Sequence, residues 1–255
     1  MALLTDFGLS DHYVGVVKGV IKGIAPLADI LDLTHDVTPF DIVEGAFLLL
    51  RAAPYLPLGC AVVAVVDPGV ATKRRPLAVA TKKRVYLGPD NGLLYPAASS
   101  EGILAIHEIT NPRFVLSLDG TFAGRDVFAP AAAHILKGVK LEDLGPARRA
   151  MKKLAWPSVR VGPGRIEGVV LHVDRFGNVV TNVDAATFDG WRSGRTKFRL
   201  LGLGFSGPVS LAHSYEEMKG LGLIVGSGGT LEVSSRRRAV DVPLKKGSSF
   251  VLSFT

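Results

Sequence analysis

The hydrophobic pattern of the chain changes near residue 150, and this change most limits the folds open to it. Before it, short apolar runs alternate with stretches of helical spacing, which is typical of an α/β domain. After it, short strand-like runs are separated by turns, which favours a small β-barrel or β-sandwich. We therefore expect an α/β domain with a mostly parallel sheet over 1–150, a linker over 151–165, and a smaller all-β, barrel-like domain over 166–255.

The clearest single element is the run Ala61 to Val66, whose unbroken apolar and β-branched sequence indicates a strand buried on both faces. The other strands expected in the first domain cover 2–5, 29–33, 77–80 and 85–87, and the helices cover 14–24, 41–53 and 127–136. In the second domain we expect strands at 167–173, 178–183, 197–201, 221–225, 230–235 and 248–254, with a short helix near 214–219.

The bulk composition fits a globular protein, with 47% hydrophobic and 21% charged residues, and excludes a disordered one. The net charge of +7 raises the prospect of an anionic partner, but the basic residues are spread along the chain. There is no basic stretch interleaved with aromatics, so we expect no nucleic-acid partner. The single cysteine, Cys60, excludes an intrachain disulfide and a CxxC metal site.

The first residues lack the basic segment and apolar stretch of a signal peptide. No window reaches the ~18 apolar residues of a membrane-spanning helix, so we expect no membrane partner and, by default, a cytoplasmic protein.

Polar side chains follow the expected strands of the first domain at the points where the strands end. They are Asp6, Asp11, His35, Asp36, Asp67, Asp90 and Asn91. Ligands of parallel α/β sheets bind outside the carboxyl ends of the strands, so the set predicts a site at this edge. Any single member could instead be a turn former or a cap.

Asp67 is the most informative member, because it follows the buried strand directly and Arg74 stands seven residues later. A partly buried aspartate needs a cationic partner to remain ionised, and a guanidinium can hold both of its oxygens. We expect this pair to form. The alternative is a surface triplet, Lys73 to Arg75, near a turn aspartate.

In the second domain, the segment from Asp174 to Asn178 lies between two expected strands and brings together an acid, an aromatic ring and an amide. This combination suits a ligand with a cationic end and a flat heterocycle. The alternative is a plain hairpin turn.

Several familiar motifs are absent. The chain has no GxGxxG after a strand, no P-loop and no HExxH or other zinc spacing, so we expect no metal. Asp6-Phe7-Gly8 lacks the preceding loops of a kinase, and Gly226-Ser227-Gly228-Gly229 is not a GxSxG elbow.

Seven stretches of the chain carry a family resemblance. They are LTDFGLSDHYVG (4–15), LTHDVTPFDIVEGAF (33–47), VVDPGV (65–70), GPDNGLL (88–94), TFAGRDVFAP (121–130), VDRFGNVVTN (173–182) and GSGGTLEV (226–233). In this order they resemble the S-adenosylmethionine hydrolases, or hydroxide adenosyltransferases, which are related to the fluorinase and chlorinase. The resemblance covers nearly the whole chain and implies a homotrimer whose sites lie between one subunit's first domain and its neighbour's second.

The resemblance also implies roles for individual residues. Asp11 takes the ribose hydroxyls, Phe40 forms part of an apolar wall, and Asp174 holds the methionine ammonium. Asn178 meets the adenine edge with Phe176 beside it. The methionine carboxylate and adenine contacts fall to Ser235, Arg236 and the backbone of Ala239, where this chain departs from the usual family sequence.

Asp67 stands where the halogenases carry a tyrosine and the hydrolases an aspartate, and with Arg74 it matches two members of the hydrolases' Asp-Arg-His set. The third position departs from that set. The hydrolases read Phe-His-Gly-Arg-Asp, whereas this chain has Ala123 before Gly124. Ala123 can neither donate nor accept a proton, so activity is reduced, another group substitutes, or the chain is an altered variant.

The resemblance therefore implies hydrolysis of S-adenosylmethionine, as substrate and without a cofactor, to adenosine and methionine by attack of water at the ribose C5′. Two alternatives remain open. A halide adenosyltransferase is compatible with Gly124 but opposed by the charge of Asp67. A catalytically silent protein that binds S-adenosylmethionine or adenosine is favoured by Ala123.

Overall fold

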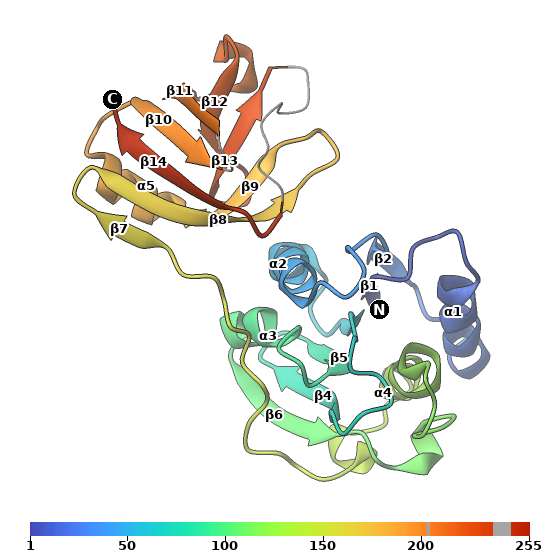
Figure 1. Cartoon of the computed structure of the whole chain (residues 1–255). Coiled ribbons are helices and arrows are strands. Elements are labelled where there is room, and N and C mark those ends of the chain that lie inside the picture. The colour runs from blue at the N-terminus through green and yellow to red at the C-terminus, as the bar shows by residue number, and fades with distance from the viewer. Residues whose placement is uncertain (203–204, 237–245) are drawn as a thin grey trace. The chain divides into compact units, whose positions relative to one another are not determined.

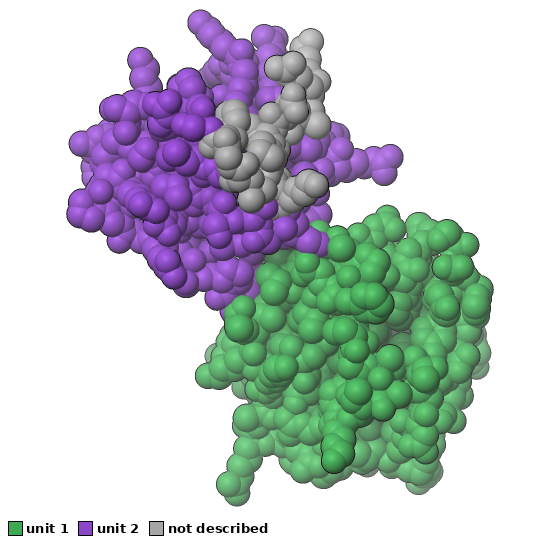
Figure 2. Space-filling view, in the orientation of Figure 1, with its two compact units in different colours: residues 1–155 green, residues 156–255 purple. Residues whose placement is uncertain are grey.

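The computed structural model describes residues 1–202, 205–236 and 246–255, and the chain divides into two compact units, 1–155 and 156–255 (Figure 1, Figure 2). The segment expected to be a linker, 151–165, spans this division, and its last residues belong to strands of the second unit.

Unit 1 consists of one sheet with helices on both faces (Figure 1). Its strands are β1 (Ala2–Thr5), β2 (Leu31–Thr34), β3 (Ala61–Val65), β4 (Pro76–Thr81), β5 (Val85–Pro89) and β6 (Ile103–Glu108). Its helices are α1 (Tyr13–Ile24), α2 (Ile42–Ala52), α3 (Tyr95–Glu101) and α4 (Ala129–Leu136), the last preceded by a π-helical turn over Gly124–Phe128. The strand order is β2-β1-β3-β5-β4-β6.

The sheet is mixed rather than mostly parallel. The pairs β1–β2, β1–β3 and β3–β5 are parallel, as expected, but β4 pairs antiparallel with both β5 and β6. The reason is the connection between β4 and β5, which comprises only residues 82–84. A parallel neighbour needs a crossover of about a dozen residues, so these two strands can only form a hairpin.

The central strand β3 has side chains buried on both faces, as its sequence indicated. Val63 and Val65 pack in one core with α1 and α4, while Val62 and Ala64 pack in the other with α2 and α3. The alternation of side chains along a strand produces this division. It fixes the carboxyl end of β3, where the loop that carries Asp67 begins.

Unit 2 is a closed β-barrel. Its strands are β7 (Arg160–Gly162), β8 (Arg165–Val173), β9 (Val179–Asp184), β10 (Lys197–Gly202), β11 (Phe205–Leu211), β12 (Leu221–Val225), β13 (Thr230–Ser235) and β14 (Ser249–Phe254), and its helix is α5 (Ala185–Arg192). Seven strands run in the order β14-β10-β11-β12-β13-β9-β8, and the pairing of β14 with β8 closes the ring. The sequence did not indicate β7, β11 or α5, and the helix expected near 214–219 is a single 3₁₀ turn, Tyr215–Glu217.

Aromatic side chains fill one end of the barrel core. Trp191 of α5 stacks on Phe198 at 5.5 Å and on Phe254 at 4.7 Å between ring centroids. Phe188 and Phe250 are fully buried beside them. This packing attaches α5 to the barrel. The loops after β8 and β12 line a pocket of the barrel.

Candidate active site

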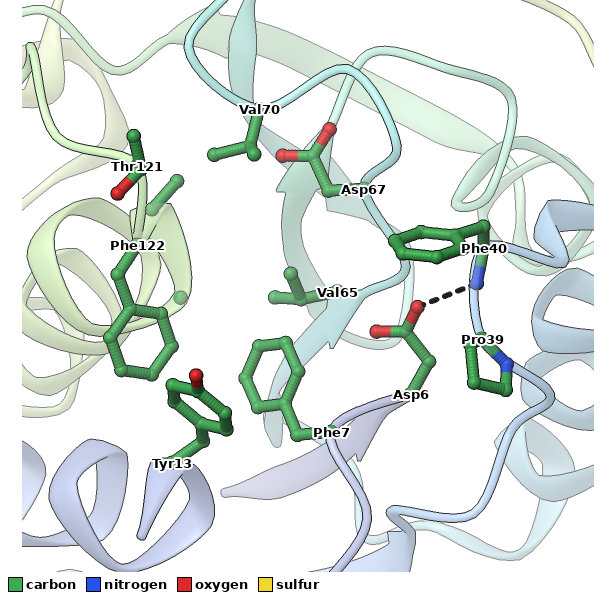
Figure 3. Close-up of a pocket in the computed structure, with 12 residues that line it drawn as sticks. Asp6, Phe7, Tyr13, Pro39, Phe40, Val65, Asp67, Val70, Thr121 and Phe122 are labelled. Carbon is green, nitrogen blue, oxygen red and sulfur yellow. Dashed lines mark hydrogen bonds between the residues drawn. The ribbon is translucent and has the colours of Figure 1, made fainter. Parts of the chain in front are cut away.

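A cavity of about 400 Å³ lies in unit 1, where the loops after β1 and β3 meet the segment before α4 (Figure 3). It is lined by Asp6, Phe7, Tyr13, Pro39, Phe40, Val65, Asp67, Val70, Thr121, Phe122, Ala123 and Gly124. Phe40, Asp67 and Gly124 were all expected at a site, and the structure brings them together.

Asp67 and Arg74 form a bidentate ion pair at this cavity. The Arg74 Nε atom donates to Oδ1 at 3.1 Å and to Oδ2 at 2.9 Å, and Nη2 lies 2.6 Å from Oδ2. The side chains are only 5% and 14% exposed, so the pair is shielded from solvent. The Arg74 guanidinium lies 5.7 Å from the centroid of the Phe128 ring, which helps to hold it in place. The alternative of a surface triplet beside a turn aspartate is therefore excluded for Arg74.

Asp6 is a second carboxylate in the same cavity. Burial raises the pKa of Asp6, and the charge of Asp67 raises it further, while a hydrogen bond from the Phe40 backbone N–H to Oδ2 at 2.9 Å opposes the shift. Phe40 has a left-handed backbone with a φ of 68°, which is uncommon for a non-glycine residue. The Asp6 carboxylate thus holds a strained residue whose ring borders the cavity (Figure 3).

Aromatic rings form the opposite wall (Figure 3). Phe122 makes edge-to-face contacts with Phe7 at 5.5 Å and with Tyr13 at 5.2 Å between ring centroids. Gly124 packs under this cluster, where an added Cβ would lie 3.0 Å from the Phe7 ring. Sequence reasoning missed Phe7 and Tyr13 as lining residues, although both stand in the stretch 4–15.

Ala123 is 5% exposed and borders two cavities. One is the cavity just described, and the other is a smaller space of about 200 Å³ that Arg74 also lines. Ala123 and Arg74 thus line the same small cavity, and the short alanine side chain leaves part of that cavity open.

Other members of the strand-end set serve the fold or lie elsewhere. Asp11 is exposed and does not line the cavity. Asp90 pairs with Arg75 and accepts from the Lys152 N–H, and the Asn91 amide donates to the Val66 carbonyl at 2.8 Å. His35 is buried, with Nδ1 2.8 Å from the Thr5 hydroxyl, and Asp36 is exposed.

A second pocket, of about 650 Å³, lies in unit 2. Its lining residues are Asp174, Phe176, Asn178, Tyr215, Ser227, Glu232 and Ser235, and four of these were expected at a site. The loop after β8 supplies Asp174, Phe176 and Asn178, and the pocket reaches β13 at Ser235. Tyr215, Ser227 and Glu232 were missed.

The Asp174 carboxylate organises the loop that carries Phe176 and Asn178. Its Oδ1 atom accepts from the Phe176 N–H at 2.9 Å and the Asn178 N–H at 2.8 Å, and Oδ2 accepts from the Asn178 side-chain amide at 2.8 Å. Gly177 has a φ of 82°, which the tight turn requires. Phe176 is 78% exposed.

Arg236 and Ala239 are the two remaining residues that the resemblance implies at the site. Arg236 is exposed, forms an ion pair with Glu216 and does not line the pocket. Ala239 lies outside the described residues.

Within the described parts of the chain, no group of three or more His, Cys, Asp or Glu side chains is arranged to hold a metal ion. No helix there is long and apolar enough to span a membrane.

The two units match the two domains of one enzyme class. Residues 1–145 match the SAM hydroxide adenosyltransferase N-terminal domain, and residues 168–244 match the C-terminal domain of the same family. The chain therefore belongs to the SAM hydroxide adenosyltransferase family.

Particular relatives carry a more specific name. The "(R)-S-adenosyl-L-methionine hydrolase" of Salinispora arenicola is 44% identical over 70% of each chain. The protein of the same name from Methanocaldococcus jannaschii is 35% identical over 92% of this chain and 87% of its own. A crystal structure of an uncharacterized conserved protein from Thermotoga maritima superposes with a TM-score of 0.91 at 33% identity and covers 99% of both chains.

Proposed function

We propose that this protein hydrolyses S-adenosylmethionine to adenosine and methionine. The observation that carries the proposal is the shielded Asp67–Arg74 pair at the cavity of unit 1, in a chain whose relatives are named hydrolases of this substrate. Water attacks C5′, the new C–O bond forms as the C5′–S bond breaks, and sulfur leaves with the electron pair as a neutral thioether. No general acid is needed, because the leaving group starts as a sulfonium cation.

The protein's task is to aim and polarise one water, because water is a very weak acid and a poor nucleophile in bulk. Asp67 accepts a hydrogen bond from this water, which directs the oxygen lone pair at C5′. The proton lost by the water passes by this hydrogen bond toward solvent. Arg74 fixes the carboxylate through both of its oxygens and offsets its negative charge.

The lining residues support a division of the substrate between the two pockets. In unit 1, Asp6 rather than Asp11 faces the cavity and offers acceptors to the ribose hydroxyls, while Phe40 forms an apolar wall. In unit 2, Asp174 is assigned to the methionine ammonium and Asn178 to the adenine edge, with Phe176 beside the adenine ring. Ser235 lines this pocket, whereas Arg236 and the Ala239 backbone keep only the assignment that the resemblance implies.

We further propose that the working form is a homotrimer in which one subunit's unit 1 and a neighbour's barrel share each site. The support is that the described residues suited to catalysis and those suited to holding the substrate line two different pockets. The cavity of unit 1 has the Asp67–Arg74 pair, and the barrel pocket has the acceptors for an amino acid and a base.

The test is chromatography of S-adenosylmethionine incubated with the protein and with Asp67→Asn. We expect the wild type to release adenosine and methionine in equal amounts. Asn keeps the shape of the side chain but removes its charge, so turnover should fall by roughly 10²- to 10⁴-fold, as for loss of a group in proton-transfer catalysis. Asp29→Asn, which alters an exposed aspartate outside the cavity, serves as the matched control. Turnover retained by Asp67→Asn would exclude the proposed role.

One observation favours a second candidate, a protein that binds the substrate without turning it over. Ala123 places a methyl group where the hydrolases carry a histidine, so the water loses one orienting partner. Ala123→His in the same assay separates the two functions. Release of adenosine by both proteins supports the hydrolase, and release by the His variant alone supports the binding protein.

The same assay with added chloride tests for halide transfer, which would give a halogenated nucleoside. The negative charge of Asp67 opposes this reaction.

A further inference from the structure

The pocket of the barrel is acidic. Among the described residues that line it, Asp174 and Glu232 are carboxylic acids and none is a lysine, arginine or histidine. A pocket of this charge favours a ligand group with a positive charge. The two carboxylates nevertheless differ in how much of their hydrogen-bonding capacity is already used.

Asp174 has little capacity left for a ligand. A carboxylate has about four acceptor positions. The loop after β8 fills three of them, through the Phe176 N–H, the Asn178 N–H and the Asn178 amide. About one position, on Oδ2, remains for a ligand.

Glu232 is the less occupied carboxylate. It lies on β13 and is 9% exposed, and among the described residues its Oε2 atom accepts one hydrogen bond, from the Tyr215 hydroxyl at 3.3 Å. Its carboxylate lies directly against Gly226, where an added Cβ would collide with Oε1. The absence of a side chain at Gly226 therefore makes the space that this carboxylate occupies.

Among the described residues that line the pocket, none supplies a cation to compensate the charge of Glu232. Burial raises the pKa of Glu232, and the charge of Asp174 raises it further, while the Tyr215 hydrogen bond lowers it. Its ladder partners on β12 and β9 are Ile224 and Val180, which do not titrate. The nearby Arg236 is paired with Glu216. A cationic ligand group would supply the missing charge.

We propose that Glu232 is a specificity-determining residue that, together with Asp174, binds the α-ammonium group of the substrate, an inference that rests on the proposed function. An ammonium has three N–H donors. Asp174 can accept about one of them, and Glu232 supplies a second, charged acceptor from β13. The pocket thereby distinguishes adenosyl ligands that carry an amino acid from those that do not.

The experiment compares two nucleosides that differ in the amino group. S-adenosylhomocysteine carries the amino acid and has no sulfonium, whereas 5′-methylthioadenosine lacks the amino acid. Their dissociation constants are measured by calorimetry at pH 8 for the wild type, Glu232→Gln and a control. The control is Glu167→Gln, which removes the same charge from β8 at a residue paired with Arg165 outside the pocket.

We expect Glu232→Gln to weaken S-adenosylhomocysteine by roughly 10- to 100-fold, the range for a hydrogen bond to a charged group, and to leave 5′-methylthioadenosine unchanged. Lowering the pH through the pKa of Glu232 should weaken S-adenosylhomocysteine binding to the wild type, and this dependence should be lost in Glu232→Gln. With S-adenosylmethionine as substrate, KM should rise while kcat at saturation stays the same.

A second variant retains the charge but moves it. Gly226→Ala should displace the Glu232 carboxylate and reproduce the selective loss of S-adenosylhomocysteine binding. Equal losses for both nucleosides, or no loss in Glu232→Gln, would overturn the inference. If the wild type releases adenosine but Glu232→Gln binds S-adenosylhomocysteine as tightly as the wild type, only the inference about Glu232 fails. If the wild type neither binds these ligands nor releases adenosine, the proposed function fails as well.

Discussion

Asp6 and Asp67 border one cavity, yet their partners give them different electrostatic properties. Asp67 is matched by a guanidinium that contacts both of its oxygens. Asp6 has a single backbone N–H from Phe40, and burial raises its pKa. The cavity thus holds one neutralised carboxylate and one that is costly to ionise, which suits a site that must accept hydroxyl groups without repelling an attacking oxygen.

The raised pKa of Asp6 predicts a pH-dependent stability. The unfolded chain ionises Asp6 at a lower pH than the folded protein, so the wild type loses stability as the pH rises through the folded pKa. Asp6→Asn cannot ionise, and its amide oxygen can still accept from the Phe40 N–H. We expect the free energy of unfolding of Asp6→Asn, relative to wild type, to increase with pH above the unfolded value of about 4. Urea titrations across this range measure it, and a constant or falling difference would contradict the assignment.

At the scale of residues, sequence reasoning found the acceptors but not all of their partners. The spacing of Asp67 and Arg74 on either side of a turn was enough to expect their ion pair. The resemblance assigned the ribose hydroxyls to Asp11, but both Asp6 and Asp11 follow β1, and only the packed loop shows that Asp6 is the one that lines this cavity. Ser227 and Glu232 belong to the β12–β13 hairpin and Tyr215 to the segment before β12, and only the folded barrel brings them to one pocket with the loop after β8.

At the scale of elements, the π-helical turn before α4 sets the wall of the unit 1 cavity. It places Gly124 under the rings of Phe7 and Phe122, at 3.0 Å and 3.3 Å from where a Cβ would stand. Such turns often occur at functional sites. The turn thus links the start of α4 to the shape of the cavity.

Gly124→Ala tests this link. The added methyl should force the Phe7 and Phe122 rings apart, which costs about 1–3 kcal/mol of stability and weakens substrate binding. The matched control is Gly19→Ala in the exposed face of α1, where nothing lies within 4 Å of the new atom. That change should stabilise the protein by up to about 1 kcal/mol. Thermal unfolding and KM measure both variants, and a Gly124→Ala protein as stable as wild type would refute the tight packing.

Two of the elements that sequence reasoning missed, β11 and α5, have weak local signals. Strand β11 contains Gly207 and Pro208, both unfavourable in strands, and its pairing with β10 and β12 overrides this preference. Helix α5 contains Gly190 and is held by the Asp184 cap and by the packing of Trp191 on the barrel core. The antiparallel β4 could have been anticipated from its three-residue connection to β5. By contrast, β3 was evident because burial on both faces leaves no polar positions.

At the scale of the whole molecule, the proposed shared site makes the activity a property of the assembly. Light scattering should give the mass of three chains. Asp67→Asn alters unit 1 and Asp174→Asn alters the barrel, so each variant alone should be inactive. In mixed trimers made by co-expression, one subunit can supply the intact unit 1 and its neighbour the intact barrel. Random mixing then leaves about one site in four intact. Mixed trimers without any recovery would show that each site lies within one chain.

The central claim is that water displaces methionine at C5′, and incubation of S-adenosylmethionine in ¹⁸O-labelled water tests it most directly. Mass spectrometry of the nucleoside product follows the oxygen. We predict adenosine that carries one ¹⁸O in its 5′-hydroxyl group, formed in equal amount with unlabelled methionine. Unlabelled adenosine, a halogenated nucleoside, or substrate recovered intact would contradict the claim.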